Sequence, residues 1–189
     1  MDVKELLNRY AAGERNFHGI VLPKADLRGV HLGGVDFGRA DLRGANLAKA
    51  SMSGANLCKA NLQGANLEHA NLSEVIFCGA DLCEATLTTA NLNESDLSGA
   101  YLCDADLCDA TLHMASLSAA NLQRVNLSDA KMSGVRMWKA DLRESDLSGA
   151  DLSEANLSEA NLTGANLNAT DMSEAFLTGT IMPDGTIHK

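Results

Sequence analysis

A large apolar residue occupies every fifth position of this chain from Leu22 to Met182, without one skipped repeat. Of these 33 positions, 26 are Leu and the others are Phe or Met. The residue two positions earlier is Ala in 23 of the 33 repeats, and otherwise Val, Ser, Thr or Ile. The backbone must therefore return a large and a small apolar side chain to the interior every five residues.

A repeat of five residues excludes the two regular secondary structures. An α-helix turns by about 100° per residue, so the Leu residues would spread around the whole cylinder. In a flat strand the side chains alternate between two faces, so successive Leu residues would lie on opposite sides. A chain that extends for a few residues and then turns keeps them all inside. The pattern predicts a solenoid of short stacked units.

The residues that flank each large apolar position fit such a turn. Glycine stands two positions after it in 11 repeats, which accounts for most of the 16 glycines. We expect a positive φ at this position, because glycine adopts it at the least cost. Asp or Asn mostly stands one position before it, and these side chains readily bond backbone amides in turns.

The runs ADLRG ANLAK, ANLCK ANLQG and SGADL SEANL resemble the pentapeptide-repeat proteins, whose unit is A(D/N)LXX. The resemblance covers nearly the whole chain. It implies an all-β fold, a right-handed quadrilateral β-helix with four units per coil, so that residues 20 positions apart stack. The pair Phe17 and Phe37 and the pair Glu74 and Glu94 have that spacing. Residues 20–182 would form about eight coils, a rod roughly 39 Å long at ~4.8 Å per layer.

The resemblance is of the cyanobacterial type at both ends of the chain. The segments MDVKELLNRYAAGERNFHG and IMPDGTIHK are similar to the ends of cyanobacterial members, among them a regulator of heterocyst differentiation. This similarity implies a regulatory setting, with a protein as the partner.

We divide the chain into a helix at 1–13, the repeat region at 14–182 and a turn and tail at 183–189. The helix is expected to cover the first coil, with Asp2 as N-cap and Gly13 as its stop. A helix that lies on a membrane surface or on a partner is the alternative, although its polar face is not strongly basic. In the tail, a Pro-Asp-Gly turn should fold the end over the last coil and return Ile187 to the repeat.

Charge and composition restrict the class of protein further. The chain has no apolar leader segment, so we expect a cytoplasmic protein that does not enter a membrane. Its net charge of −10 argues against direct binding of nucleic acid. Charge is uneven: residues 1–60 carry 9 basic and 6 acidic side chains, whereas 61–130 carry 1 and 10. We expect a monomer or weak dimer.

The five cysteines all stand one position after a large apolar residue and should point outward. Cys58 stacks on Cys78 and Cys83 on Cys103, with Cys108 alone. Thiols are expected in the cytoplasm, and in-register Cβ atoms would strain a disulfide. The two pairs face different directions, which excludes a zinc site of four convergent ligands. They are interpreted as tolerated exterior residues, with redox sensing as the alternative.

No catalytic constellation accompanies the repeat. The five histidines do not recur at spacings of 5 or 20 from one another, so they form no repeated site. Serine belongs to the corner positions, and no base is expected beside it. We therefore expect no enzyme, no cofactor and no metal.

The outward positions that break the pattern are the candidate functional residues. Trp138, the only Trp, stands between Arg136 and Lys139 in the sequence. With Arg124, Lys131 and Arg143 it is predicted to form a basic and aromatic island, because Trp and Arg are enriched at interface hot spots. A ring lying on its neighbours among solvated charges is the equal alternative.

An acidic belt precedes this island. Its candidate residues are Asp81, Glu84, Asp104, Asp106 and Asp109. The leading hypothesis is a non-enzymatic scaffold that presents both surfaces to a protein partner in a cyanobacterial regulatory pathway. The alternative, implied by the family, is a DNA-mimicking modulator of DNA gyrase, which the acidity and rod shape favour and the basic first third opposes.

Overall fold

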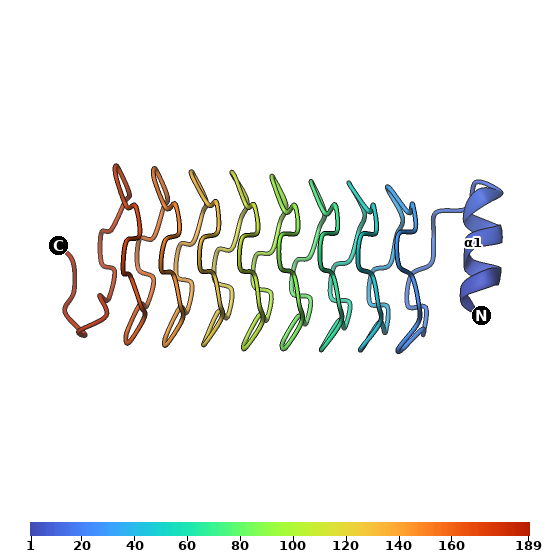
Figure 1. The fold of residues 1–189 in the computed structure, drawn as a ribbon, viewed down its shortest axis with the longest axis horizontal. Helices are drawn as coiled ribbons and strands as arrows, with labels where there is room; N and C mark the ends of the chain where they lie inside the picture. Colours follow the sequence, from blue (N-terminus) through green and yellow to red (C-terminus); the bar gives the residue numbers. More distant parts are fainter.

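The computed structural model describes residues 1–189 as a straight rod with one short helix at its N-terminal end (Figure 1). This helix, α1, runs Val3–Ala11. The Asp2 side chain accepts a hydrogen bond from the Glu5 amide at 2.8 Å, as predicted for its N-cap. Leu6 is fully buried against the solenoid, and the Tyr10 hydroxyl donates to the Gly33 carbonyl at 2.8 Å. The helix therefore covers the first coil.

The rest of the chain winds into coils that pair in parallel. The residue before each large apolar position bridges its counterpart 20 positions later, from Asn16 with Asp36 to Asn161 with Ile181. Each bridge is isolated, so the coils have no longer strands with bounds of their own. The predicted stacking of residues 20 apart is confirmed. No helix here has the length and apolar character needed to cross a membrane.

The core is a column of 56 buried hydrophobic residues inside the rod. Most are the Leu and Ala of the repeat, and their exposed fraction is close to zero from Leu27 to Leu162. Backbone hydrogen bonds between coils surround this column, as between the Leu62 amide and the Asp81 carbonyl at 2.7 Å. The prediction that the large and small apolar residues of the repeat point into the interior is confirmed.

The C-terminal end is more open than expected. Leu167, Met172, Leu177 and Met182 are only partly buried. The tail turns back, and Ile187 pairs antiparallel with Ile181. Ile187 is 65% exposed, so the prediction that it returns to the repeat is wrong. A chain that reverses direction cannot continue the winding that points the large side chain inward.

Each coil turns at four corners, named here by their first residues. The His18 corner holds 18–19 and the pairs that follow at multiples of 20; the Pro23, Arg28 and Gly33 corners are built likewise. The side between the His18 and Pro23 corners, with Val21 outward, is the Val21 side. The second residue of each corner from Gly19 to Gly179 has a positive φ, as predicted for the glycines. However, 21 residues other than glycine adopt the same conformation, with φ from 55° to 61°.

Candidate functional site

Trp138 lies at the His18 corner with 43% of its surface exposed. The Lys139 ammonium stands 4.4 Å from the centre of its ring. The indole N–H donates to Glu159 Oε1 at 3.3 Å, and Lys139 Nζ lies 3.3 Å from Glu159 Oε2. Arg136 is exposed on the adjoining side of the same coil. We name these four residues the Trp138 patch.

The structure does not bring the whole predicted island together. Lys131 lies on another side of the rod, where it bridges Thr111 and Asp151. Arg143 stands at the Pro23 corner and pairs with Asp141 at 2.6 Å. The prediction that these residues form a single island is therefore wrong, because residues five positions apart lie on successive sides of a coil.

Arg124 is also separate from the Trp138 patch, since it stands at the Pro23 corner and pairs with Asp104. Glu159, by contrast, belongs to the patch and was missed by sequence reasoning. Its position 20 residues after Lys139 is the signal that would have found it.

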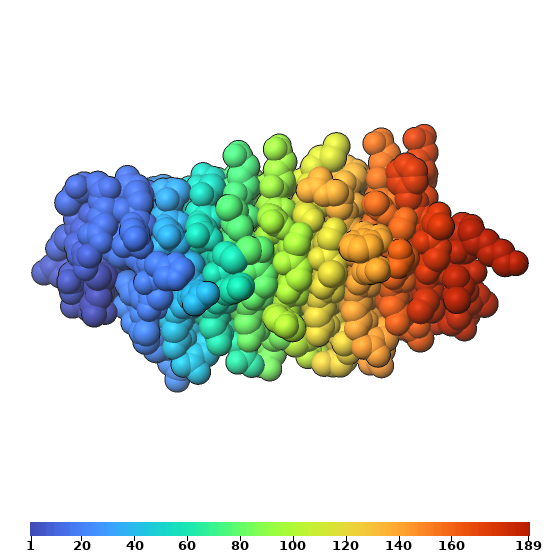
Figure 2. Space-filling view, turned by 180° about the vertical axis from the view of Figure 1, so that it is seen from behind, coloured from blue at the N-terminus to red at the C-terminus, as the bar shows by residue number.

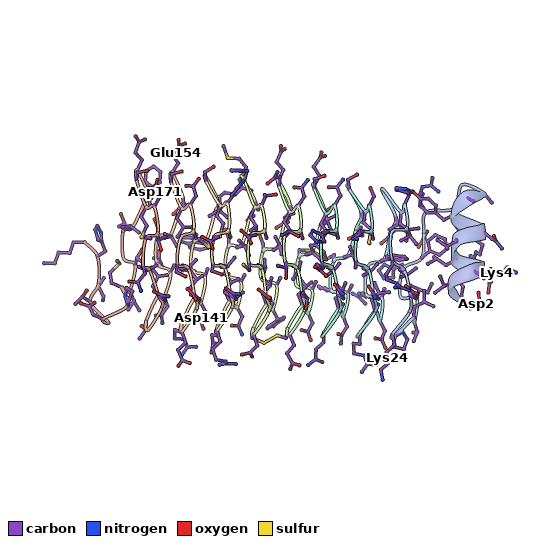
Figure 3. All side chains as sticks on the ribbon, in the orientation of Figure 1. Asp2, Lys4, Lys24, Asp141, Glu154 and Asp171 are labelled. Atoms are coloured by element: carbon purple, nitrogen blue, oxygen red, sulfur yellow. A yellow bond between two sulfur atoms is a disulfide. The ribbon has the colours of Figure 1, made fainter.

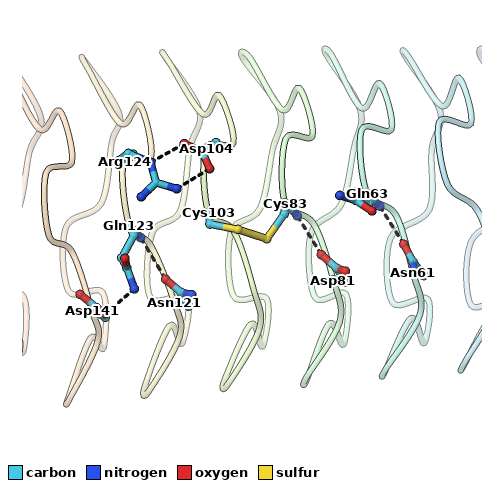
Figure 4. Close-up of a disulfide and its surroundings, with 10 residues drawn as sticks. All are labelled: Asn61, Gln63, Asp81, Cys83, Cys103, Asp104, Asn121, Gln123, Arg124 and Asp141. Atoms are coloured by element: carbon cyan, nitrogen blue, oxygen red, sulfur yellow. Dashed lines mark hydrogen bonds and ion pairs between the residues drawn. A yellow bond between two sulfur atoms is a disulfide. The ribbon is translucent and has the colours of Figure 1, made fainter.

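Most carboxylates of the predicted acidic belt form hydrogen bonds within the chain. Asp104 takes two hydrogen bonds from Arg124, both at 2.7 Å, and this guanidinium lowers the pKa of its carboxyl (Figure 4). Asp81 and Asp106 each accept the amide two residues later at 3.1 Å. Glu84 at the Pro23 corner and Asp109 at the Arg28 corner remain as outward acids, and Asp109 accepts only from the Cys108 thiol, at 3.5 Å.

A second acidic row runs along the Gly33 corner, and sequence reasoning did not assign it a role. It contains Glu74, Glu94, Glu154 and Glu174, and this corner has no Lys or Arg. Figure 3 places Glu154 and Lys24 on opposite edges of the rod. In the space-filling view, side chains project singly along the upper edge of the middle and C-terminal coils (Figure 2). The 20-residue spacing of these glutamates was the available signal.

Four cysteines form two disulfides, so the expectation that all five are thiols is wrong. Cys58 is bonded to Cys78 at the His18 corner and Cys83 to Cys103 at the Pro23 corner, while Cys108 is free. The Cα atoms of each pair are 4.7 Å apart, inside the range that a disulfide spans. The corner side chains rotate toward each other across that distance, as Figure 4 shows for Cys83 and Cys103.

One serine does have a base beside it, contrary to expectation. Ser133 Oγ lies 2.7 Å from His113 Nδ1 across two coils of the Gly33 corner. The imidazole has no other hydrogen-bond partner in the chain; the backbone amide of His113 donates to Asn93 Oδ1 at 2.9 Å. With no carboxylate to orient the imidazole and no cavity around it, the pair lacks the parts of a nucleophilic site.

Two shallow grooves mark the surface, both near the N-terminal end. One, of about 360 Å³, lies where α1 meets the first coil and is lined by Met1, Arg9 and His18 among others. The other, of about 460 Å³, follows the Pro23 corner from Lys24 to Glu84 and has no hydrophobic lining. Neither groove is enclosed enough to exclude water from a reaction.

Comparisons with known proteins agree on one family. The model of the family described as pentapeptide repeats matches in eight copies between residues 25 and 182. HetL, a pentapeptide repeat protein involved in heterocyst differentiation regulation from the cyanobacterium Nostoc sp. strain PCC 7120, is 34% identical over 100% of both chains, with a TM-score of 0.38.

Two further solved structures are similar over most of the chain. QnrB1, a plasmid-mediated fluoroquinolone resistance protein, is 22% identical over 85% of this chain and 88% of its own, with a TM-score of 0.62. A pentapeptide repeat protein of the Arabidopsis thaliana thylakoid lumen is 28% identical over 68% and 69% respectively, with a TM-score of 0.25. A comparison with curated proteins finds no match. The chain belongs to the pentapeptide-repeat family, whose members fold as right-handed quadrilateral β-helices.

Proposed function

We propose that this protein is a non-enzymatic scaffold that docks a protein partner through the Trp138 patch. The observation that carries the proposal is a 43% exposed Trp at a corner where the repeat requires no aromatic residue. Trp and Arg are the residues most enriched at the energetic centres of protein interfaces.

The contacts of the patch suit a binding surface. Lys139 and Glu159 hold the Trp138 ring from two coils, through the ring face and the indole N–H. A side chain that is already ordered loses less conformational entropy when a partner covers it. The charges of Lys139, Glu159 and Arg136 surround the ring, as polar residues surround an apolar hot spot.

A cyanobacterial regulatory pathway, such as heterocyst differentiation, is the setting that we propose. It is supported by the resemblance of both chain ends to cyanobacterial members of the family. The acidic belt would serve as a second contact region, with Glu84 and Asp109 as its outward acids. A scaffold of this kind acts through position and charge, and needs no cofactor.

Capture of partners from an extract of the native cell tests the proposal. The tagged protein should retain a partner that Trp138→Ala loses, whereas Ser98→Ala, at the same corner two coils away, should retain it. Equal recovery by wild type and Trp138→Ala would refute the role of the patch. Circular dichroism of both variants confirms that each is folded before the comparison.

The second candidate is a DNA-mimicking modulator of DNA gyrase. It is favoured by the net charge of −10 and by the acidic row at the Gly33 corner. The basic first third argues against it, because its charge is opposite to that of DNA. A supercoiling assay with purified gyrase decides between the two candidates, since no effect at a large molar excess of this protein excludes the second.

A further inference from the structure

The first coils differ in charge from the rest of the rod. Residues 1–60 carry a net charge of +3, while the whole chain carries −10. In these coils the arginines at 28 and 43 pair with Asp26 and Asp41. Lys24, Arg39 and Lys59 are exposed and take part in no salt bridge. No carboxylate of the chain therefore lies within salt-bridge distance of these three cations.

Two of these cations stack on each other. Arg39 and Lys59 occupy the same position of consecutive coils at the His18 corner, where consecutive Cα atoms lie 4.7 Å apart at Cys58 and Cys78. Like charges at such a spacing repel and destabilise the fold slightly. An anion from outside the chain would remove that repulsion.

Lys24 and Arg43 stand at the Pro23 corner, across the Val21 side from this pair. The Val21 side therefore has cations along both of its edges, and Val21 itself is 63% exposed. We name this surface, bounded by Lys24, Arg39, Arg43 and Lys59, the basic strip. Lys24 in Figure 3 marks one of its edges.

The groove of about 460 Å³ lies along one edge of the basic strip. It exists because the corner residues of two successive coils are Gly44 and Gly64. A Cβ built on Gly44 would lie 3.4 Å from Lys24 Cγ, so the lysine stem crosses that glycine, whereas nothing lies within 4 Å of a Cβ on Gly64. The side chains of Lys24 and Gln63 offer hydrogen-bond donors into this open space, and Arg43 lines it while paired with Asp41.

The basic strip is short and has acidic limits. Glu84 lines the far end of the groove, and Asp104 follows one coil later at the same corner. A long, uniformly charged polyanion such as duplex DNA would meet these carboxylates. A short anionic segment would be repelled from the acidic coils and attracted to the N-terminal end, which fixes where it binds.

From this geometry we propose that the basic strip docks an acidic, extended polypeptide segment of a partner protein. Carboxylates of the segment pair with Lys24 in the groove and with Arg39 and Lys59 across the Val21 side. The inference rests on the proposed scaffold function in that the ligand is a protein. It concerns a surface separate from the Trp138 patch.

Fluorescence anisotropy with the full-length protein tests the inference. The probe is a fluorescein-labelled peptide of about ten alternating Glu and Ser residues, which extends roughly 33 Å. At low salt it should bind, and Lys24→Glu with Lys59→Glu should weaken binding by about tenfold or more. Both positions tolerate glutamate, because Glu84 has the same positive φ. Binding should weaken as salt rises.

The matched control is Lys131→Glu with Lys189→Glu, an equal change of charge at exposed lysines outside both the basic strip and the Trp138 patch. It should leave peptide affinity within about twofold of wild type, because screening limits the effect of distant exposed charges. Equal weakening by both double variants would show a nonspecific effect of net charge and overturn the proposal. So would failure of the wild type to bind, or preference for a DNA duplex over the peptide at matched salt.

Trp138→Ala separates this inference from the proposed function. It should leave peptide affinity unchanged even if it abolishes capture of the cellular partner. Loss of capture with peptide binding intact supports two independent surfaces. Unchanged capture together with peptide binding that depends on Lys24 and Lys59 refutes the Trp138 patch alone.

Discussion

Reduction of the two disulfides should destabilise the middle of the rod. Each disulfide joins a residue to the one 20 positions later, at equivalent corners of consecutive coils. In the unfolded chain the bond closes a loop of that length and removes conformational entropy. By the loop-entropy relation this amounts to roughly 3 kcal/mol of free energy of unfolding per disulfide at 25 °C.

The corresponding change in melting temperature is large enough to measure. For a chain of this size, 1 kcal/mol shifts the midpoint by about 2–4 °C, so each disulfide should contribute roughly 6–13 °C. The native coils already hold the two Cα atoms 4.7 Å apart, so little of the folded structure needs to change when the bond opens. The effect therefore acts mainly through the unfolded state.

Thermal melts followed by circular dichroism, with and without a phosphine reductant, provide the measurement. Thiol titration in denaturant should give one thiol per chain before reduction and five afterwards, since only Cys108 is free. Cys83→Ser should lower the midpoint in the absence of reductant, and Cys108→Ser should leave it unchanged. If full reduction raises the thiol count but the midpoint stays within about 1 °C, the loop-entropy reasoning is refuted.

Two further outcomes follow from the core and from the corners. Leu97→Ala should reduce the free energy of unfolding by about 2–5 kcal/mol, because the side chain is fully buried. Leu177→Ala should cost clearly less, because Leu177 is only partly buried; equal losses in urea unfolding would contradict this. Hydrogen bonds from Arg143 hold the pKa of Asp141 below its ordinary value of 3.8. The ionised Asp141 carboxylate therefore stabilises the fold fully at pH values above 3.8, and this contribution is lost as the pH falls through the pKa that the group has in the folded protein. Asp141→Asn should flatten the acid limb of a plot of melting temperature against pH.

The interior could be predicted from the sequence because one geometric requirement fixes it. Large apolar residues such as Leu97 stand at every fifth position, and they can all be buried only if the chain turns after each five-residue unit. The 20-residue register was also accessible, since paired residues such as Phe17 and Phe37 occur at that spacing. Their rings lie 6.1 Å apart in an edge-on arrangement.

The surface was harder to predict, because neighbours in sequence are not neighbours in space. Lys131 and Arg143 were grouped with Trp138 by proximity in the chain, yet the coil carries them to other sides. The disulfides were missed because backbone register fixes Cα separations and leaves corner side chains free to rotate. Ile187 was predicted to continue the repeat because it stands five positions after Met182. The chain reverses direction before it, and the spacing of residues does not reveal such a reversal.

The positive φ of the corner residues has a consequence for how this surface can change over time. Glycine would adopt the conformation with least strain, yet 21 corners hold other residues, among them Lys24, Lys59 and Glu84. Each such side chain carries a conformational cost of about 1 kcal/mol that glycine would avoid. Replacement of such a residue by glycine would relieve this cost and remove a side chain from the surface. The shape and charge of the corners are thus obtained at the expense of stability, and the cost is spread along the rod from Lys24 to Glu174.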